Sequence, residues 1–320
     1  MITGALTSKS RRILATLCLA LGAVILSSCG GTPTALPDPE IKIYLLDLSG
    51  SGDVQNQFRL IKEDLVQDLT SKSLGSPYTM QGPSLTKFYF VGTNSRALRE
   101  FSLQDHQVAY DLYKKIAADN NSTRAEVYWR LLSDDYQNYI TQKLDSKQAL
   151  TKEDCRQDFN EILKSTWATD SGREGYSSFM CKMAEYSITH YQDLQQYIDT
   201  ESKPGVQKAS DVFGALSKIG SQISKFRKDF PNSQIQVTLA TDGDHYVGIS
   251  SPDNLSDRLK KAPDSTICAI AEEYRQKFQL TGLTNSSMLQ IDSRGIAALT
   301  NGTGEYPRKL ESFWQCFFPQ

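Results

Sequence analysis

Short apolar stretches recur along the chain and are predicted to form strands. Residues 41–46 (IKIYLL), 85–91 (LTKFYFV) and 235–240 (IQVTLA) are mostly apolar, and residues 278–283 (FQLTGL) form a weaker fourth stretch. Runs of this length without strict alternation are typical of strands that are buried on both faces of a parallel sheet.

Apolar residues at helical spacing follow most of these stretches. After the first stretch, residues 58–69 place Phe58, Ile61 and Leu65 on one face of a helix. The same spacing predicts further helices over residues 211–226, 265–278, 291–299 and 307–318. Repeated strand–helix units indicate an α/β fold with a doubly wound, mostly parallel central sheet of the Rossmann-like type.

Residues 101–202 differ in character from the rest of the chain. They are rich in Tyr, Gln, Asp and Lys and show helical spacing, for example at Tyr136, Tyr139 and Ile140. Because the segment interrupts the strand–helix pattern, we predict a helical insertion there, between a first part (40–100) and a second part (203–320) of the α/β domain.

The N-terminal residues 1–28 are predicted to be a signal peptide. Positive charges at Lys9, Arg11 and Arg12 precede a largely apolar run over residues 13–26. That run has the length of a signal-peptide core and is too short to span a bilayer comfortably. An uncleaved anchor helix and a plain secretory signal are the alternatives.

The end of the signal peptide resembles the lipobox of bacterial lipoproteins. Leu26-Ser27-Ser28-Cys29 has an apolar residue, two small residues and a cysteine in the required order. The resemblance implies that Cys29 carries a lipid on the bacterial cell envelope, either on the outer membrane or on the extracytoplasmic face of the plasma membrane. Residues 29–39 are predicted to be a tether, which reaches roughly 30 Å if it is extended.

Charge and cysteine content narrow the class of protein further. The chain has 35 Lys and Arg against 37 Asp and Glu, and removal of residues 1–28 leaves 32 basic residues and a formal charge of −5. This balance argues against nucleic acid as a partner. The cysteines that remain besides Cys29 allow three disulfide pairings, and closeness in sequence favours Cys155 with Cys181 and Cys268 with Cys316. Four free thiols are the alternative.

Oxygen-bearing side chains follow two of the predicted strands directly. Asp47, Ser49 and Ser51 come after the first strand, and Asp242 comes after residues 235–240. In an open α/β sheet, ligands bind outside the carboxyl ends of the strands. Carboxylate and hydroxyl oxygens suit a hard divalent cation, whereas helix capping by the same side chains is the structural alternative.

These residues resemble the motifs of von Willebrand factor type A domains. Asp47-Leu48-Ser49-Gly50-Ser51 matches the DxSxS motif of the metal-ion-dependent adhesion site, and Thr241-Asp242-Gly243 matches the later Thr-Asp-Gly. Between them the family has a threonine in a pattern such as G-T-D-I-x-x-A-L. Residues 209–216 (ASDVFGAL) resemble this pattern, with Ser210 in the threonine position and Ala209 in place of glycine. Ser177 and Ser178 are a rival third element.

The resemblance implies a function in binding. Asp47, Ser49, Ser51, Ser210 and Asp242 are expected to hold a divalent cation, with Mg²⁺ favoured over Mn²⁺ and Ca²⁺. A protein partner is expected to complete the coordination with an Asp or Glu carboxylate. Asp244 and His245 follow Asp242 on the same rim and are candidate partner contacts.

The sequence contains no signature of the enzyme classes that this pattern otherwise permits. Ser49 occupies the position where a phosphotransfer hydrolase of the haloacid dehalogenase type needs a second aspartate. Neither a GxSxG elbow nor a phosphate-binding glycine loop is present in the sequence. We therefore expect a binding protein rather than an enzyme. An enzyme accessory subunit and a structural envelope protein with a vestigial metal site are the alternatives.

Overall fold

The computed structural model describes most of the chain beyond the predicted tether. The predicted signal peptide, Cys29 and Ser51 lie outside the described residues, as do parts of the predicted helix at 291–299. The described ranges are 37–49, 54–72, 82–117, 122–146, 152–164, 170–249, 251–280, 283, 286–292 and 304–318.

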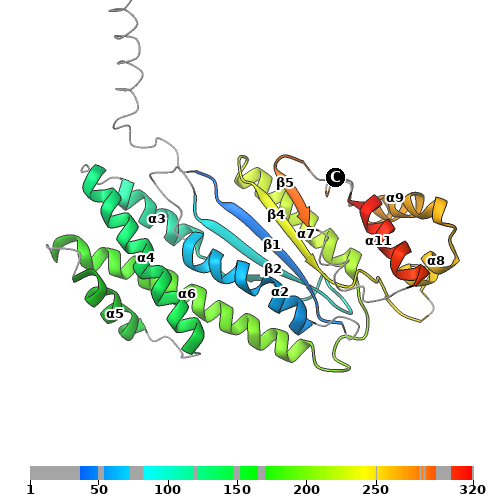
Figure 1. The fold of residues 1–320 in the computed structure, drawn as a ribbon, viewed down its shortest axis with the longest axis horizontal. Coiled ribbons are helices and arrows are strands. Elements are labelled where there is room, and N and C mark those ends of the chain that lie inside the picture. Colours follow the sequence, from blue (N-terminus) through cyan, green and yellow to red (C-terminus); the bar gives the residue numbers. More distant parts are fainter. Residues whose placement is uncertain are drawn as a thin grey trace, which may run out of the picture.

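A mixed, mostly parallel sheet lies at the centre of the fold (Figure 1). Its strand order is β3-β2-β1-β4-β5, and only β3 is antiparallel to its neighbour. The predictions for β1, β2 and β4 are confirmed to within one residue at each end. The strands are β1 (Glu40–Asp47), β2 (Ser84–Val91), β3 (Phe101–Ser102), β4 (Ile235–Ala240) and β5 (Leu289–Asp292).

Helices cover both faces of this sheet, which confirms the predicted α/β architecture. On one face, Tyr44 and Leu46 of β1 share a hydrophobic cluster with residues of the helices that precede Ser202. These helices are α2 (Val54–Gln67, extended by a wider turn over Asp68–Lys72), α3 (His106–Ala117), α4 (Ser122–Ser146), α5 (Lys152–Lys164) and α6 (Asp170–Glu201). The helices of residues 101–202 therefore pack against the same core as α2, and their status as an insertion stays a prediction.

The opposite face carries the helices of the C-terminal part. Ile41, Ile43 and Leu45 of β1 point to this side, so alternate residues of one apolar strand supply two separate cores. The helices here are α7 (Val212–Asp229), α8 (Leu255–Lys261), α9 (Ile267–Lys277) and α11 (Glu305–Phe317), with a short 3₁₀ turn over Asp264–Thr266. In Figure 1, α8, α9 and α11 form a group at the opposite end of the molecule from α4 and α5. Within the described residues, no helix is both long and apolar enough to cross a membrane.

Near the C-terminus, the predicted strand over 278–283 was wrong where it is described, and the predicted helix over 291–299 does not begin at Ile291. α9 ends at Lys277, Phe278 is its C-cap and Leu280 follows in an irregular segment, so the predicted strand over 278–283 does not form in its described part. The fifth strand is instead β5, which includes Ile291 and Asp292 at the start of the predicted helix 291–299. The run Leu289–Asp292 is too short to show a period of its own, and its pairing with β4 determines its conformation.

Both favoured disulfides are confirmed. Cys155 of α5 is bonded to Cys181 of α6, and Cys268 of α9 is bonded to Cys316 of α11. Each bond joins two helices of one face, with Cα atoms 5.6 Å and 5.2 Å apart, respectively. The second bond holds the C-terminal helix against the sheet-covering helices.

Phe213 of α7 is the centre of the C-terminal core, and its removal is expected to be costly. Its side chain is fully buried, with six aromatic rings between 4.7 and 6.3 Å away. We predict that Phe213→Ala lowers the free energy of unfolding by about 3–5 kcal/mol, measured by urea denaturation. Arg227→Ala on the exposed face of α7 is the control, expected within about 0.5 kcal/mol of wild type. Equal effects of the two variants would show that Phe213 is not central to the core.

Candidate metal centre

Asp47 is the buried residue around which the candidate site is built. It ends β1 and is completely shielded from solvent. The backbone N–H of Asp47 donates to Oε1 of Gln57 on α2 at 2.8 Å, and the backbone N–H of Ser49 donates to Oδ1 of Asp47 at 2.9 Å. Local hydrogen bonds therefore fix both the end of the strand and one oxygen of the carboxylate.

The second carboxylate oxygen of Asp47 connects distant parts of the chain. Ser210 Oγ donates to Oδ2 at 3.2 Å, and Thr241 Oγ1 donates to the same atom at 2.6 Å. Parallel pairing explains the second contact, because Leu46 lies opposite Ala240 and the next residues, Asp47 and Thr241, leave the sheet side by side. The structure thus brings Ser210, rather than the rival Ser177 in the interior of α6, to the predicted aspartate.

Backbone hydrogen bonds hold Ser210 in place from one side. Its N–H donates to the carbonyl of Tyr246 at 2.7 Å, and Tyr246 N–H donates to the Ser210 carbonyl at 3.0 Å. The next residue, Asp211, donates from its N–H to the carbonyl of Gly92 and caps α7 by accepting from Gly214 N–H at 2.9 Å. Because Asp211 caps the start of α7, Ser210 lies just before that helix, between the loop after β2 and the loop after β4.

The loop after β4 turns sharply at Gly243. This glycine has a φ of 75°, a backbone conformation that other residues rarely adopt. The turn lets Asp244 N–H donate to Oδ1 of Asp242 at 3.0 Å, while Trp314 of α11 donates from its indole N–H to the Gly243 carbonyl at 3.1 Å. The C-terminal helix therefore supports the loop that carries Asp242.

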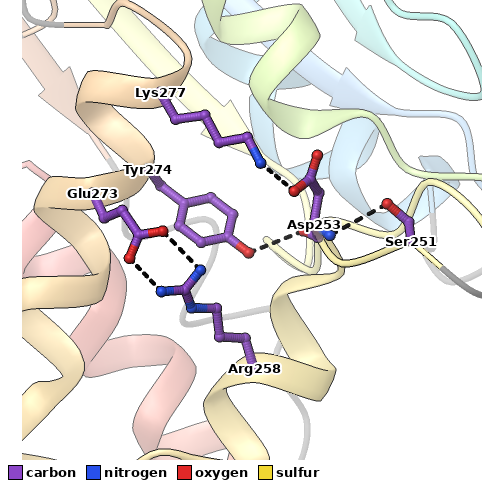
Figure 2. A network of polar contacts seen from close by, with 6 residues as sticks. All are labelled: Ser251, Asp253, Arg258, Glu273, Tyr274 and Lys277. Carbon is purple, nitrogen blue, oxygen red and sulfur yellow. Dashed lines mark hydrogen bonds and ion pairs between the residues drawn. The ribbon is translucent and has the colours of Figure 1, made fainter.

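A second polar network fixes the far end of the same loop (Figure 2). Arg258 of α8 forms a two-pronged ion pair with Glu273 of α9, and Lys277 pairs with Asp253. The hydroxyl of Tyr274 donates to the Asp253 carbonyl at 3.0 Å, between the two ion pairs. These contacts attach Asp253 to α9, so the loop from Asp242 is anchored at both ends.

The electrostatics of the site favour a bound positive charge. Burial, followed by the nearby charge of Asp242, raises the pKa of Asp47 to about 6, although hydrogen bonds from Ser49 and Thr241 act to lower it. Two carboxylates that repel each other are stabilised by a cation between them or by a proton. The site therefore has the charge that a divalent cation would neutralise.

The two candidate partner contacts occupy different environments. Asp244 is half-buried, and burial followed by the charge of Asp242 raises its pKa. His245 is only 1% exposed and packs against Phe213 with ring centroids 4.7 Å apart. Burial lowers its pKa to about 4, so the ring is neutral at pH 7. Its side chain belongs to the core, unlike the rim position that the sequence suggested.

The candidate ligand atoms are of the kind that a hard cation prefers. Asp47, Asp242, Ser49 and Ser210 offer only oxygen atoms, and a hydroxyl that donates to a carboxylate can still accept or coordinate through its lone pairs. Thr241 of the Thr-Asp-Gly motif supplies an additional hydroxyl, for which the sequence predicted no role. Within the described residues, no group of three or more His, Cys, Asp or Glu side chains is arranged for a metal ion, so this site relies on hydroxyls beside two carboxylates.

The raised pKa of Asp47 gives the apo protein a specific pH dependence. The folded state holds the Asp47 proton more tightly than the unfolded state, where the pKa is near 3.8. Its contribution to stability is therefore complete below about pH 4 and is lost as the pH rises through 6. Relative to Asp47→Ala, wild type should lose about 3 kcal/mol between about pH 4 and 7, without divalent cations. Denaturant titrations at several pH values measure this, and a constant difference would contradict the buried-carboxylate assignment.

Comparison with known proteins adds no assignment. No protein-family model, curated protein or solved structure matches this chain. The function is therefore argued from the residues of the site and their contacts.

Proposed function

We propose that this chain is a lipid-anchored envelope protein that binds a divalent cation at Asp47 and, through that ion, a protein partner. The observation that carries the proposal is the buried carboxylate of Asp47, which lies within the field of Asp242 and accepts hydrogen bonds from Ser210 and Thr241. These groups come from three separate segments and meet at the carboxyl edge of neighbouring strands, where ligands of open α/β sheets bind.

The proposed ligands are those of a von Willebrand factor type A domain. Asp47, Ser49, Ser210 and Asp242 supply oxygen atoms from three loops, and Ser51 would add a further hydroxyl. In this proposal, residues 101–202 are an insertion into that domain. The bound ion would neutralise the two carboxylates and act as a Lewis acid toward an acidic group of the partner.

The ion is proposed to be Mg²⁺, with Mn²⁺ and Ca²⁺ as competitors. All the candidate ligands are oxygen atoms, which excludes a preference for soft ions. Two protein carboxylates together with hydroxyls and water suit the small coordination shell of Mg²⁺, which keeps several waters in protein sites. Space left by those waters is where the carboxylate of a partner protein would bind.

One further observation supports a different function. Ser210, Thr241 and the Ser49 N–H already satisfy the Asp47 carboxylate by hydrogen bonds, and the raised pKa permits a proton there instead of a metal. A structural envelope protein with a vestigial site would use the same contacts to join β1, β4 and the segment before α7. The two functions differ in whether a cation binds at all.

Calorimetric titration of the protein with Mg²⁺, Mn²⁺ and Ca²⁺ tests the proposal. We expect saturable binding that Asp242→Ala weakens at least about 100-fold, because removal of a ligand exceeds the 10–100-fold typical of supporting residues. Ser210→Ala should weaken binding less, and Ser210→Thr should retain it, because the hydroxyl is kept. Asp134→Ala, which removes an exposed carboxylate from α4, is the matched control and should leave binding unchanged.

The same variants test the protein partner. A partner captured from envelope extract in the presence of Mg²⁺ should be released by a chelator and should fail to bind Asp242→Ala. Absence of cation binding in wild type favours the vestigial site. Cation binding together with chelator-independent capture would instead restrict the metal to a structural role.

Lipid attachment is tested separately at Cys29. We predict that the chain expressed in bacteria with labelled palmitate takes up the label and fractionates with membranes, and that Cys29→Ala abolishes the label. Cys18→Ala, within the predicted signal peptide, is the matched control and should not change labelling. Cleavage without labelling in wild type would show a plain secretory signal instead.

A further inference from the structure

Lys87 on β2 is a partly buried amine without an ionic partner. In the part of the chain that the structure describes, its ammonium group forms neither a hydrogen bond nor an ion pair, although the residue is not exposed. Every other described lysine that is not exposed has a partner. These pairs are Lys42 with Asp68 (2.6 Å), Lys143 with Asp158 (3.5 Å), Lys218 with the Leu98 carbonyl (2.7 Å) and Lys309 with the Ala262 carbonyl (2.7 Å).

The side chain of Lys87 lines a cavity of about 400 Å³. Strands β2 and β3, the start of α3, Tyr186 of α6 and the last part of α7 surround this space. Leu85, Phe226 and Phe230 form its apolar wall. The cavity is large enough for a small organic molecule, and polar and charged side chains make up the rest of its lining.

Three carboxylates and a second lysine line the cavity with Lys87, but none of these described groups forms an ion pair with it. Burial lowers the pKa of Lys87, the charge of Glu100 raises it, and the charge of Lys225 lowers it. Glu100 and Asp229 line the cavity but are exposed, so solvent screens them. Asp105 is engaged in capping α3, since its Oδ1 accepts from the N–H groups of Gln107 and Val108.

His106 is the remaining basic group at this cavity. Burial lowers its pKa, and the charge of Lys87 lowers it further, whereas Asp105 raises it. The ring packs edge-on against Phe230 at 5.6 Å and forms no hydrogen bond among the described residues. A neutral imidazole beside the ammonium of Lys87 is available to donate to an anion.

We propose that this cavity binds a small organic carboxylate, whose anionic group pairs with Lys87 and whose carbon body lies against Leu85, Phe226 and Phe230. A buried charge without a partner is unfavourable, and an anion from solution would supply the missing partner. The apolar wall favours an organic acid over inorganic phosphate. Lys87 lies four residues before Val91, the neighbour of Asp47, which is about 13 Å along the strand, so this site is independent of the metal centre.

Ligand-observed saturation-transfer NMR with 4-methylpentanoate as the probe tests the proposal. The neutral amide of the same carbon body, 4-methylpentanamide, and inorganic phosphate serve as comparison ligands. We expect the carboxylate to bind at least about tenfold more tightly than the amide, and Lys87→Met to abolish this difference. Equal binding of acid and amide, binding unchanged in Lys87→Met, tighter binding of phosphate, or no binding of the carboxylate would each overturn the proposal.

Thermal unfolding without ligand separates this role from a structural one. Lys87→Met removes a charge without a partner and should raise Tm by roughly 2 °C or more. Lys42→Met is the matched control on β1, because it leaves the fully buried Asp68 without its ion pair and should lower Tm. If Lys87→Met lowered Tm as Lys42→Met does, the amine would be part of the fold's own stabilisation, and the ligand site would be refuted.

Discussion

The carboxylate of Asp47 is the interaction on which the candidate site depends. It is buried at the end of the central strand β1, and each oxygen has hydrogen-bond donors from protein groups. Because a buried carboxylate is costly without such donors, the segments that supply them must lie at fixed positions. Ser210 is 163 residues away and Thr241 is 194 residues away along the chain, so this one group connects the two halves of the sheet's carboxyl edge.

The loops that meet at Asp47 are held from the outside as well. Trp314 reaches from α11 to Gly243, and the disulfide between Cys268 and Cys316 fixes α11 to α9. α9 in turn binds Asp253 through Tyr274 and Lys277. The helix α11 therefore acts on the loop of Asp242 through a short series of direct contacts.

Sequence patterns predicted most of the fold because strongly apolar strands and long helices depend mainly on local spacing. The limits of β4 illustrate this, as does the pairing of cysteines close in sequence. Short elements failed because tertiary pairing determines them: β5 forms by its register with β4, and β3 consists of two residues opposite Lys87 and Phe88. Motif spacing placed Ser210 beside Asp47, but it did not reveal the burial of His245 or the contacts of Thr241 and Gln57.

The two proposed sites would neutralise charges of opposite sign. At Asp47 the excess charge is negative, and the hydroxyl groups that would bind a cation already lie beside the carboxylate. A cation would take the place of a proton and relieve the repulsion from Asp242 without reorganising the protein. At Lys87 the ammonium group has no ion-pair partner among the described residues and the space beside it is open, so an anion would supply volume as well as charge. The first site lies at hydroxyl-rich strand ends, and the second lies where β2 and β3 meet the last part of α7. One sheet can therefore present both sites without electrostatic conflict, because four residues of β2 separate them.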